Sequence, residues 1–164
     1  MVAVTGSAGK TTTKEMIAQV LAAQFETMKT QGNLNNRVGL PKTLLTLDET
    51  IEAAVIEMGM NHFGEIADLT HCAKPDMAVI TNIGEAHIEF LGSREGILKA
   101  KMEIIQGMKP GSPLILNGDD DLLRGLDCPQ MEKIYYGLEN DLCDVKGKDV
   151  VEEGGRTTFT IVYG

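Results

Sequence analysis

Tryptophan is absent from this chain of 164 residues, and aromatic residues make up only 4% of it. The core must therefore be built from Val, Ile, Leu, Met and Ala, which suits helices packed on a buried sheet. Cysteine is scarce as well: Cys72, Cys128 and Cys143 are odd in number and show no C-x-x-C spacing. This pattern argues against a disulfide framework or a zinc site and predicts reduced thiols in a cytoplasmic protein.

Excess positive charge and long apolar runs are also missing. The 15 lysines and arginines face 24 acidic residues, which gives a net charge of −9. Such an acidic surface repels nucleic acid and anionic membranes, so we expect neither as a partner. No apolar run approaches the ~18 residues that span a bilayer. The hydrophobic content of 43% instead predicts a single globular domain.

Short apolar runs alternate with helical patterns along most of the chain. We expect strands at 2–4, 53–58, 77–81 and 114–116, and helices at 12–25, 41–47, 65–73, 94–108 and 120–126. This alternation predicts an α/β fold of the P-loop type, in which a mostly parallel sheet carries helices on both faces. The pattern changes near residue 144, where the runs 145–151 and 157–163 flank a Gly-Gly pair and predict a C-terminal β-hairpin.

The strongest functional signal is the segment TGSAGKTT, which follows a strand and opens a helix. Glycines let backbone N–H groups turn towards phosphate oxygens, and the helix N-terminus adds partial positive charge. Lys10 would reach the β- and γ-phosphates, and the Thr11 hydroxyl would bind Mg²⁺. Val4 stands where the usual motif has its first glycine, so a chance glycine-rich turn is the alternative. We predict ATP contacts from Gly6, Ser7, Ala8, Gly9, Lys10, Thr11 and Thr12.

Polar side chains follow three further strands, where ligands of open α/β sheets bind. Glu57 could hold Mg²⁺ against the ATP phosphates, although a solvated loop acid is the alternative. His87 could contact a metal or a phosphate, although a lone histidine is more often structural. Asn117 has the paired donor and acceptor that suit an adenine edge, while a turn with helix capping by a following Asp explains the segment equally well.

Two further clusters of polar residues occupy loops. Asn35 and Asn36 precede a Gly-Leu-Pro segment, and Asn61 and His62 come shortly after the strand that ends at Glu57. Both clusters could face a polar substrate, although turn chemistry explains them nearly as well.

Together these residues resemble the Mur ligase family. The segments TGSAGKTTT, NLNNRVGLP, EMGMNHFGEI, TNIGEAHIEFLGS, ILKAKMEI and LNGDD occur in the family's order and approximate spacing, over about residues 2–121. The Glu-Met-Gly at 57–59, followed by NHFGEI, is similar in particular to members that add D-alanyl-D-alanine.

The resemblance implies an ATP-dependent peptide ligase of peptidoglycan precursor synthesis. The γ-phosphoryl group would activate the carboxylate of UDP-N-acetylmuramoyl-tripeptide as an acyl phosphate, which the amine of D-alanyl-D-alanine then attacks. Thr11 and Glu57 would hold one Mg²⁺, and His87 would hold another together with Lys101, the lysine that resembles the family's carbamylated one. The neighbouring Lys99 lies on another side of the predicted helix.

The resemblance also implies a larger enzyme of three domains. Residues 1–164 would be the central ATPase domain, cut from between an N-terminal domain for the UDP-sugar and a C-terminal closing domain. A further helical segment with His and Asn would follow the hairpin and complete the adenine site. Because the two domains that hold the substrates are absent, we expect the fragment to bind ATP without ligating. The sequence gives neither the third residue of the tripeptide nor the oligomeric state, for which a monomer is our expectation.

Two other classes share the phosphate loop. A GTPase switch would also carry an N-K-x-D guanine motif after a later strand, and the chain has none. A nucleotide-binding module without catalysis would differ from a ligase domain in one respect, because adding the missing domains would not restore peptide ligation.

Overall fold

The computed structural model describes all 164 residues. They form one sheet of eight strands in the order β2-β3-β1-β4-β5-β6-β7-β8. Every neighbouring pair from β2 to β7 is parallel, and only β7 and β8 are antiparallel. The strands are β1 (Val2–Thr5), β2 (Thr27–Lys29), β3 (Ala53–Glu57), β4 (Met77–Ile80), β5 (Pro113–Asn117), β6 (Glu132–Gly137), β7 (Val145–Glu153) and β8 (Arg156–Tyr163). The predicted α/β fold with a terminal hairpin is confirmed.

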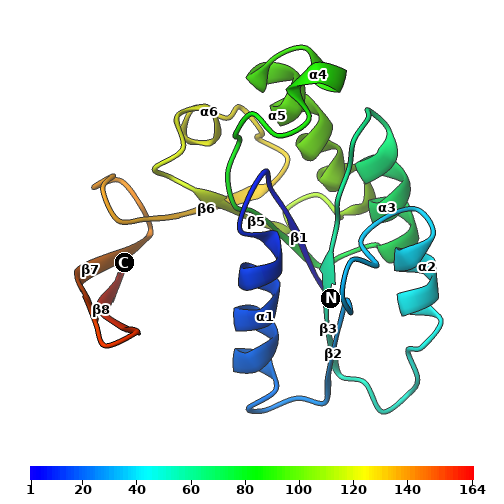
Figure 1. Ribbon diagram of the computed structural model, residues 1–164, viewed down its shortest axis with the longest axis horizontal. Coiled ribbons are helices and arrows are strands. Elements are labelled where there is room, and N and C mark those ends of the chain that lie inside the picture. The colour runs from blue at the N-terminus through cyan, green and yellow to red at the C-terminus, as the bar shows by residue number, and fades with distance from the viewer.

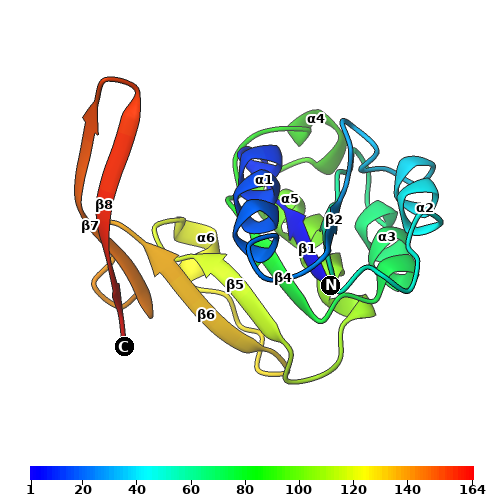
Figure 2. The same ribbon diagram turned by 90° about the horizontal axis from the view of Figure 1, so that it is seen from below.

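Helices cover both faces of the sheet (Figures 1 and 2). They are α1 (Lys10–Leu21), α2 (Gly39–Leu44), α3 (Glu65–Ala73), α4 (Ile88–Leu91), α5 (Arg94–Met102), the 3-10 helix η1 (Glu103–Gly107) and α6 (Asp121–Arg124). Successive side chains of β1 point to opposite faces of the sheet, and the core accordingly forms two clusters. Val2 and Val4 pack with Ala18 of α1, whereas Ala3 belongs to the larger cluster with α3 and α5. None of these helices is long and apolar enough to cross a membrane.

One predicted helix ends early, and two strands were not predicted. The expected helix at 94–108 is α-helical only to Met102 and continues as η1, where the Glu103 carboxylate accepts from the backbone N–H groups of Gly64 and Ala67 and so caps α3. The strands β2 and β6 were not predicted. β2 has only three residues, and β6 mixes charged and aromatic residues instead of forming an apolar run.

The hairpin of β7 and β8 stands away from the rest of the molecule (Figures 1 and 2). It joins the sheet through a short parallel pairing of Tyr136 and Gly137 with Val145 and Lys146. All eight residues of β8 are exposed. The compact part of the fold, which carries the helices, is therefore built by β1 to β6.

Candidate functional site

The segment between β1 and α1 has the backbone that a phosphate loop needs. Gly9 adopts a left-handed conformation with φ of 76° and begins α1 with no side chain capping it. The first N–H groups of a helix have no partner within it, so those of α1 are open to a ligand. Gly6 has φ of 154°, and a Cβ there would lie 1.8 Å from Oγ1 of Thr81. Both glycines are therefore required by this loop, and Gly6 has no room for a side chain.

The end of β4 holds the first half of this loop. Because β4 pairs with β1 in register, Asn82 follows β4 beside Ser7. The Oδ1 of Asn82 accepts from the backbone N–H groups of Ser7 (3.1 Å) and Ala8 (2.9 Å). The Thr81 hydroxyl donates to the carbonyl of Ala8 at 2.6 Å, and Ser7 Oγ accepts from Gly84 N at 2.9 Å. The loop is thus fixed by strand β4 as well as by its own glycines.

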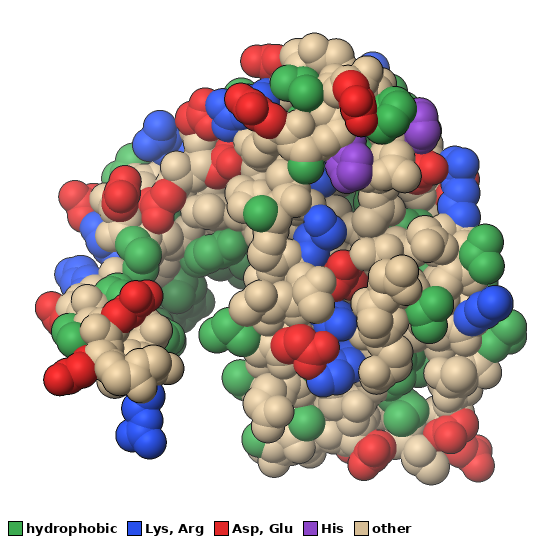
Figure 3. Space-filling model, in the orientation of Figure 1, with side chains coloured by type: hydrophobic (Ala, Val, Ile, Leu, Met, Phe, Trp, Pro, Cys, Tyr) green, Lys and Arg blue, Asp and Glu red, His purple; other side chains and the backbone are tan.

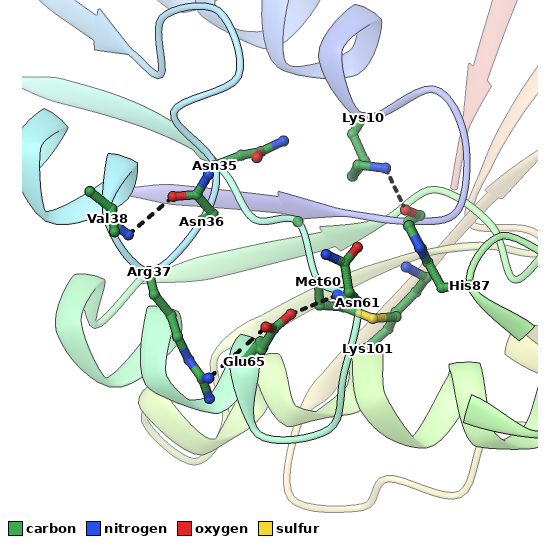
Figure 4. A pocket seen from close by; sticks show the side chains of 12 residues that line it. Lys10, Asn35, Asn36, Arg37, Val38, Met60, Asn61, Glu65, His87 and Lys101 are labelled. Atoms are coloured by element: carbon green, nitrogen blue, oxygen red, sulfur yellow. Dashed lines mark hydrogen bonds and ion pairs between the residues drawn. The ribbon is translucent and has the colours of Figure 1, made fainter. Parts of the chain in front are cut away.

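A cavity of about 530 Å³ opens beside the loop (Figure 4). Residues from five separate segments line it, among them seven of the predicted site residues. The lining consists of Gly6, Lys10, Asn35, Asn36, Arg37, Val38, Gly59, Met60, Asn61, Glu65, His87 and Lys101. The segments meet here because the central strands β1, β3 and β4 are parallel and end at the same edge of the sheet.

Two lysines line this cavity, and they differ in burial and in hydrogen bonding. Lys10 bends back over the loop and donates to the carbonyl of Gly6 at 2.9 Å. Lys101 on α5 is only 2% exposed, and its Nζ has no hydrogen-bond or ion-pair partner. Burial, with a smaller contribution from the positive charge of Lys10, lowers the pKa of Lys101 to about 7. The surroundings of Lys101 therefore favour its neutral amine.

Glu57 lies behind the cavity at the end of β3 and is 2% exposed. Its Oε1 accepts from Nδ2 of Asn35 at 2.7 Å, and its backbone N–H donates to the hydroxyl of Thr30 at 2.9 Å. The other oxygen, Oε2, is buried without any hydrogen-bond partner. Burying a carboxylate oxygen without a partner costs free energy unless a cation binds it. The Oε2 of Glu57 therefore suits a divalent metal ion such as Mg²⁺.

The far wall of the cavity is polar and bears charge of both signs. The Glu65 carboxylate accepts from the backbone N–H of Asn61 at 2.6 Å, and Arg37 pairs with Asp68 at 2.6 Å and reaches Glu65 at 3.9 Å (Figure 4). The Asn61 side chain itself makes no hydrogen bond within the chain and is free for a ligand. This wall suits a polar molecule with both donors and acceptors.

Other predicted residues have structural roles or lie elsewhere. The Asn36 side chain accepts from Val38 N and Gly39 N and so caps α2, although it also borders the cavity. The His62 ring packs against Phe90, 4.8 Å between centroids, and is not part of the lining. His87 is exposed at the rim with a left-handed backbone, φ 67°. These positions follow turn and capping rules that apply without a ligand.

Three more predicted residues lie outside the cavity. Thr11 and Thr12 are exposed on the first turn of α1. Asn117 lies at the end of β5, where its Oδ1 accepts from Asp119 N at 3.0 Å and Asp120 caps α6. Asn117 borders a second hollow of about 540 Å³ between the body and the hairpin, on the side where Figure 3 shows the hairpin separated from the rest of the surface.

No three His, Cys, Asp or Glu side chains gather into a metal cluster. A metal held by Glu57 would therefore need hydroxyl, phosphate or modified-lysine oxygens to complete its shell. The sequence reasoning missed Thr81, Asn82, Arg37 and Glu65. For Thr81 and Asn82 the signal was available, because polar residues directly after a strand that neighbours β1 must lie beside the phosphate loop.

Comparison with known proteins identifies the family of this chain. Residues 4–163 match the model of a family described as the Mur ligase middle domain. The chain is 50% identical, over 161 residues, to the UDP-N-acetylmuramoyl-tripeptide–D-alanyl-D-alanine ligase of Bacillus subtilis, covering 98% of this chain and 35% of that protein. It is 46% identical over 121 residues to the enzyme of that name from Escherichia coli, covering 74% and 27%. The chain thus spans about a third of the length of these curated relatives.

Solved structures give the same result. The MurF structure from Acinetobacter baumannii superposes with a TM-score of 0.91 at 35% identity, over 99% of this chain and 36% of that one. The MurF ligase of Thermotoga maritima in complex with ADP gives 0.89 at 38% identity, over 99% and 38%. A folylpolyglutamate synthase complex with AMPPCP, at 18% identity, gives 0.70 and shares the fold alone.

Proposed function

This chain belongs to the Mur ligase family, through that family's middle domain, and on that basis we propose that it is the ATP-binding domain of a ligase that adds D-alanyl-D-alanine to UDP-N-acetylmuramoyl-tripeptide. One observation carries the proposal. The phosphate-loop Lys10 and the buried Lys101 line one cavity, and Glu57, whose Oε2 has no partner, is hydrogen-bonded to Asn35 of the same lining. That arrangement supplies charge to a nucleotide triphosphate and an anionic donor for its metal ion.

In the proposed reaction this chain mainly positions groups and neutralises charge. Lys10 leaves the carbonyl of Gly6 and binds the phosphates, assisted by the open N–H groups of α1. The γ-phosphoryl group passes to the tripeptide carboxylate, ADP leaves, and an acyl phosphate results. The amine of D-alanyl-D-alanine attacks the carbonyl carbon, phosphate leaves, and the amine loses a proton. Glu57 and Thr11 would hold Mg²⁺, which would further neutralise the phosphate charge.

Lys101 takes the second metal position in this proposal, together with His87. A protonated lysine has no acceptor atom and cannot bind a cation. The pKa of about 7 provides the unprotonated amine that reacts with CO₂, and the resulting carbamate presents anionic oxygens of the kind that Mg²⁺ favours. The opposite wall, with Asn35, Asn61 and Arg37, is proposed to receive the polar acceptor substrate.

The nucleotide site is tested by titrating the chain with Mg-ADP in a calorimeter. Lys10→Ala should weaken binding by about 100-fold or more while leaving the melting temperature unchanged, because Lys10 contacts only the loop. Lys99→Ala is the matched control, because Lys99 is exposed and outside the cavity lining. Affinity of the Lys10 variant equal to that of the wild type would remove the basis of the proposal.

The ligase activity is tested on a longer protein that contains this domain. It should release phosphate from ATP only when D-alanyl-D-alanine and a UDP-N-acetylmuramoyl-tripeptide are both present, and peptides that differ in the third residue define its specificity. Preference for a single amino acid over the dipeptide would contradict the proposed substrate.

A further inference from the structure

The phosphate loop contains two sets of backbone N–H groups. Those of Ser7 and Ala8 already have an acceptor, because both donate to Oδ1 of Asn82 at 3.1 and 2.9 Å. Ser7 N also lies 3.1 Å from the carbonyl oxygen of Asn82. The N–H groups at the start of α1 have no acceptor in the chain, because Gly9 begins the helix without a capping side chain.

The hydrogen bonds around Asn82 form a closed frame. The Thr81 hydroxyl donates to the carbonyl of Ala8, and Gly84 N donates to Ser7 Oγ. Strand pairing fixes the base of this frame, since Thr81 N donates to the carbonyl of Thr5 at 3.0 Å. The Asn82 carbonyl oxygen accepts from two consecutive backbone N–H groups, as a phosphate oxygen would. It therefore keeps these two N–H groups pointing to one place when no nucleotide is bound.

We propose that Asn82 is a positioning residue for nucleotide binding. Its side-chain carbonyl oxygen holds Ser7 and Ala8 in the phosphate-binding conformation both without and with the nucleotide. The phosphates then bind only the N–H groups of Gly9 to Thr12. This inference rests on the proposed function and adds a residue to it. Asn82 acts through the loop and does not itself touch the nucleotide. Pre-ordering of the loop lowers the entropy lost on binding.

Amide hydrogen exchange, measured by NMR on the whole chain, tests the frame without any ligand. In the wild type, the Ser7 and Ala8 amides should be protected equally with and without Mg-ADP, whereas those of Gly9 to Thr12 should gain protection only with it. Asn82→Ala should accelerate exchange at Ala8 by at least tenfold, and less at Ser7, which still donates to the backbone carbonyl of residue 82. Asn82→Asp keeps an acceptor oxygen at the position of Oδ1 and should restore the protection.

Calorimetric titration with Mg-ADP tests the consequence for binding. Asn82→Ala should raise the dissociation constant about tenfold. Asp48→Ala is the matched control, because the Asp48 carboxylate also accepts two hydrogen bonds within a loop, from the backbone N–H and the hydroxyl of Thr50, but lies outside the cavity. It should lower stability without changing affinity.

The outcomes separate the two proposals. Failure of the wild type to bind Mg-ADP rejects the proposed function. If the wild type binds, but Asn82→Ala binds equally well or leaves the exchange of Ser7 and Ala8 unchanged, the function stands and the role of Asn82 is rejected. Loss of Ser7 and Ala8 protection when Mg-ADP is added would also reject it, because the hydrogen bonds to Asn82 would then be broken in the bound state.

Discussion

Replacing the two glycines of the phosphate loop with alanine should have very different effects. Both have positive φ, 154° at Gly6 and 76° at Gly9. A Cβ on Gly9 would have no atom within 4 Å, whereas one on Gly6 would lie 1.8 Å from Oγ1 and 3.0 Å from Cβ of Thr81. Gly9→Ala is therefore a test of backbone strain alone, and Gly6→Ala adds a collision with β4.

The magnitudes follow from these contacts. A left-handed alanine costs about 1 kcal/mol, so Gly9→Ala should lose about that much stability. Gly6→Ala adds strain of about 1–3 kcal/mol in a region essentially reserved for glycine, and about 1 kcal/mol for the lost bond from Thr81 to Ala8. The total of about 2–4 kcal/mol corresponds to a fall in melting temperature of roughly 6–12 °C, against roughly 3 °C for Gly9→Ala.

Thermal and urea unfolding, followed by circular dichroism, measure both values. Thr81→Ala in the Gly6→Ala background removes the oxygen at 1.8 Å but leaves the Cβ at 3.0 Å, so it should recover only part of the loss and the two substitutions should not be additive. A Gly6→Ala variant within 1 kcal/mol of Gly9→Ala would refute the reasoning, because the collision would then have no energetic consequence.

The remaining predictions concern Lys101 and the isolated chain. Because burial lowers the pKa of Lys101 to about 7 in the folded state, the unfolded chain binds more protons between pH 7 and 10, and stability should rise with pH there. Between pH 7 and pH 9 the free energy of unfolding in urea should rise by up to about 2 kcal/mol more in the wild type than in Lys101→Met. If it changes equally with pH in both proteins, the low pKa of Lys101 is contradicted. In the longer enzyme, Lys101→Ala should lose turnover and Lys99→Ala should keep it; the reverse result would show that the wrong lysine was chosen. The 164-residue chain alone should form no peptide bond from the three substrates, because lost positioning forfeits about 7–11 kcal/mol of barrier lowering, and detection of ligated product by mass spectrometry would disprove this.

Much of the fold could be predicted from the sequence because its strands are buried on both faces. β3 and β4 read as continuous apolar runs, and the structure confirms both. β2 and β6 could not be found in this way. β2 is three half-buried residues at the sheet edge, and β6 is recognisable only once β5 offers it a partner.

The candidate site was predictable where chemistry and strand ends coincide. Lys10, Glu57 and Lys101 were chosen for their residue types and positions, and the fold brings all three to one region. The contribution of Asn82 could not be read from residue type, because an asparagine after a strand is ordinary turn chemistry. Its partners are 74 and 75 positions away, and only the register of β4 on β1 reveals them.

The strand order has a consequence for where this fold can change. After β1 the chain moves by way of α1 to β2 and β3 on one side, and then crosses β1 to reach β4 and β5 on the other. The cavity therefore lies at a topological switch point, where successive connections depart in opposite directions and no crossover covers the crevice. Its walls are loops, whereas its position depends on buried strands. Substitutions and insertions in the loops after β2 and β3 can consequently alter the polar wall of the cavity while the phosphate loop, held from β4, remains unchanged.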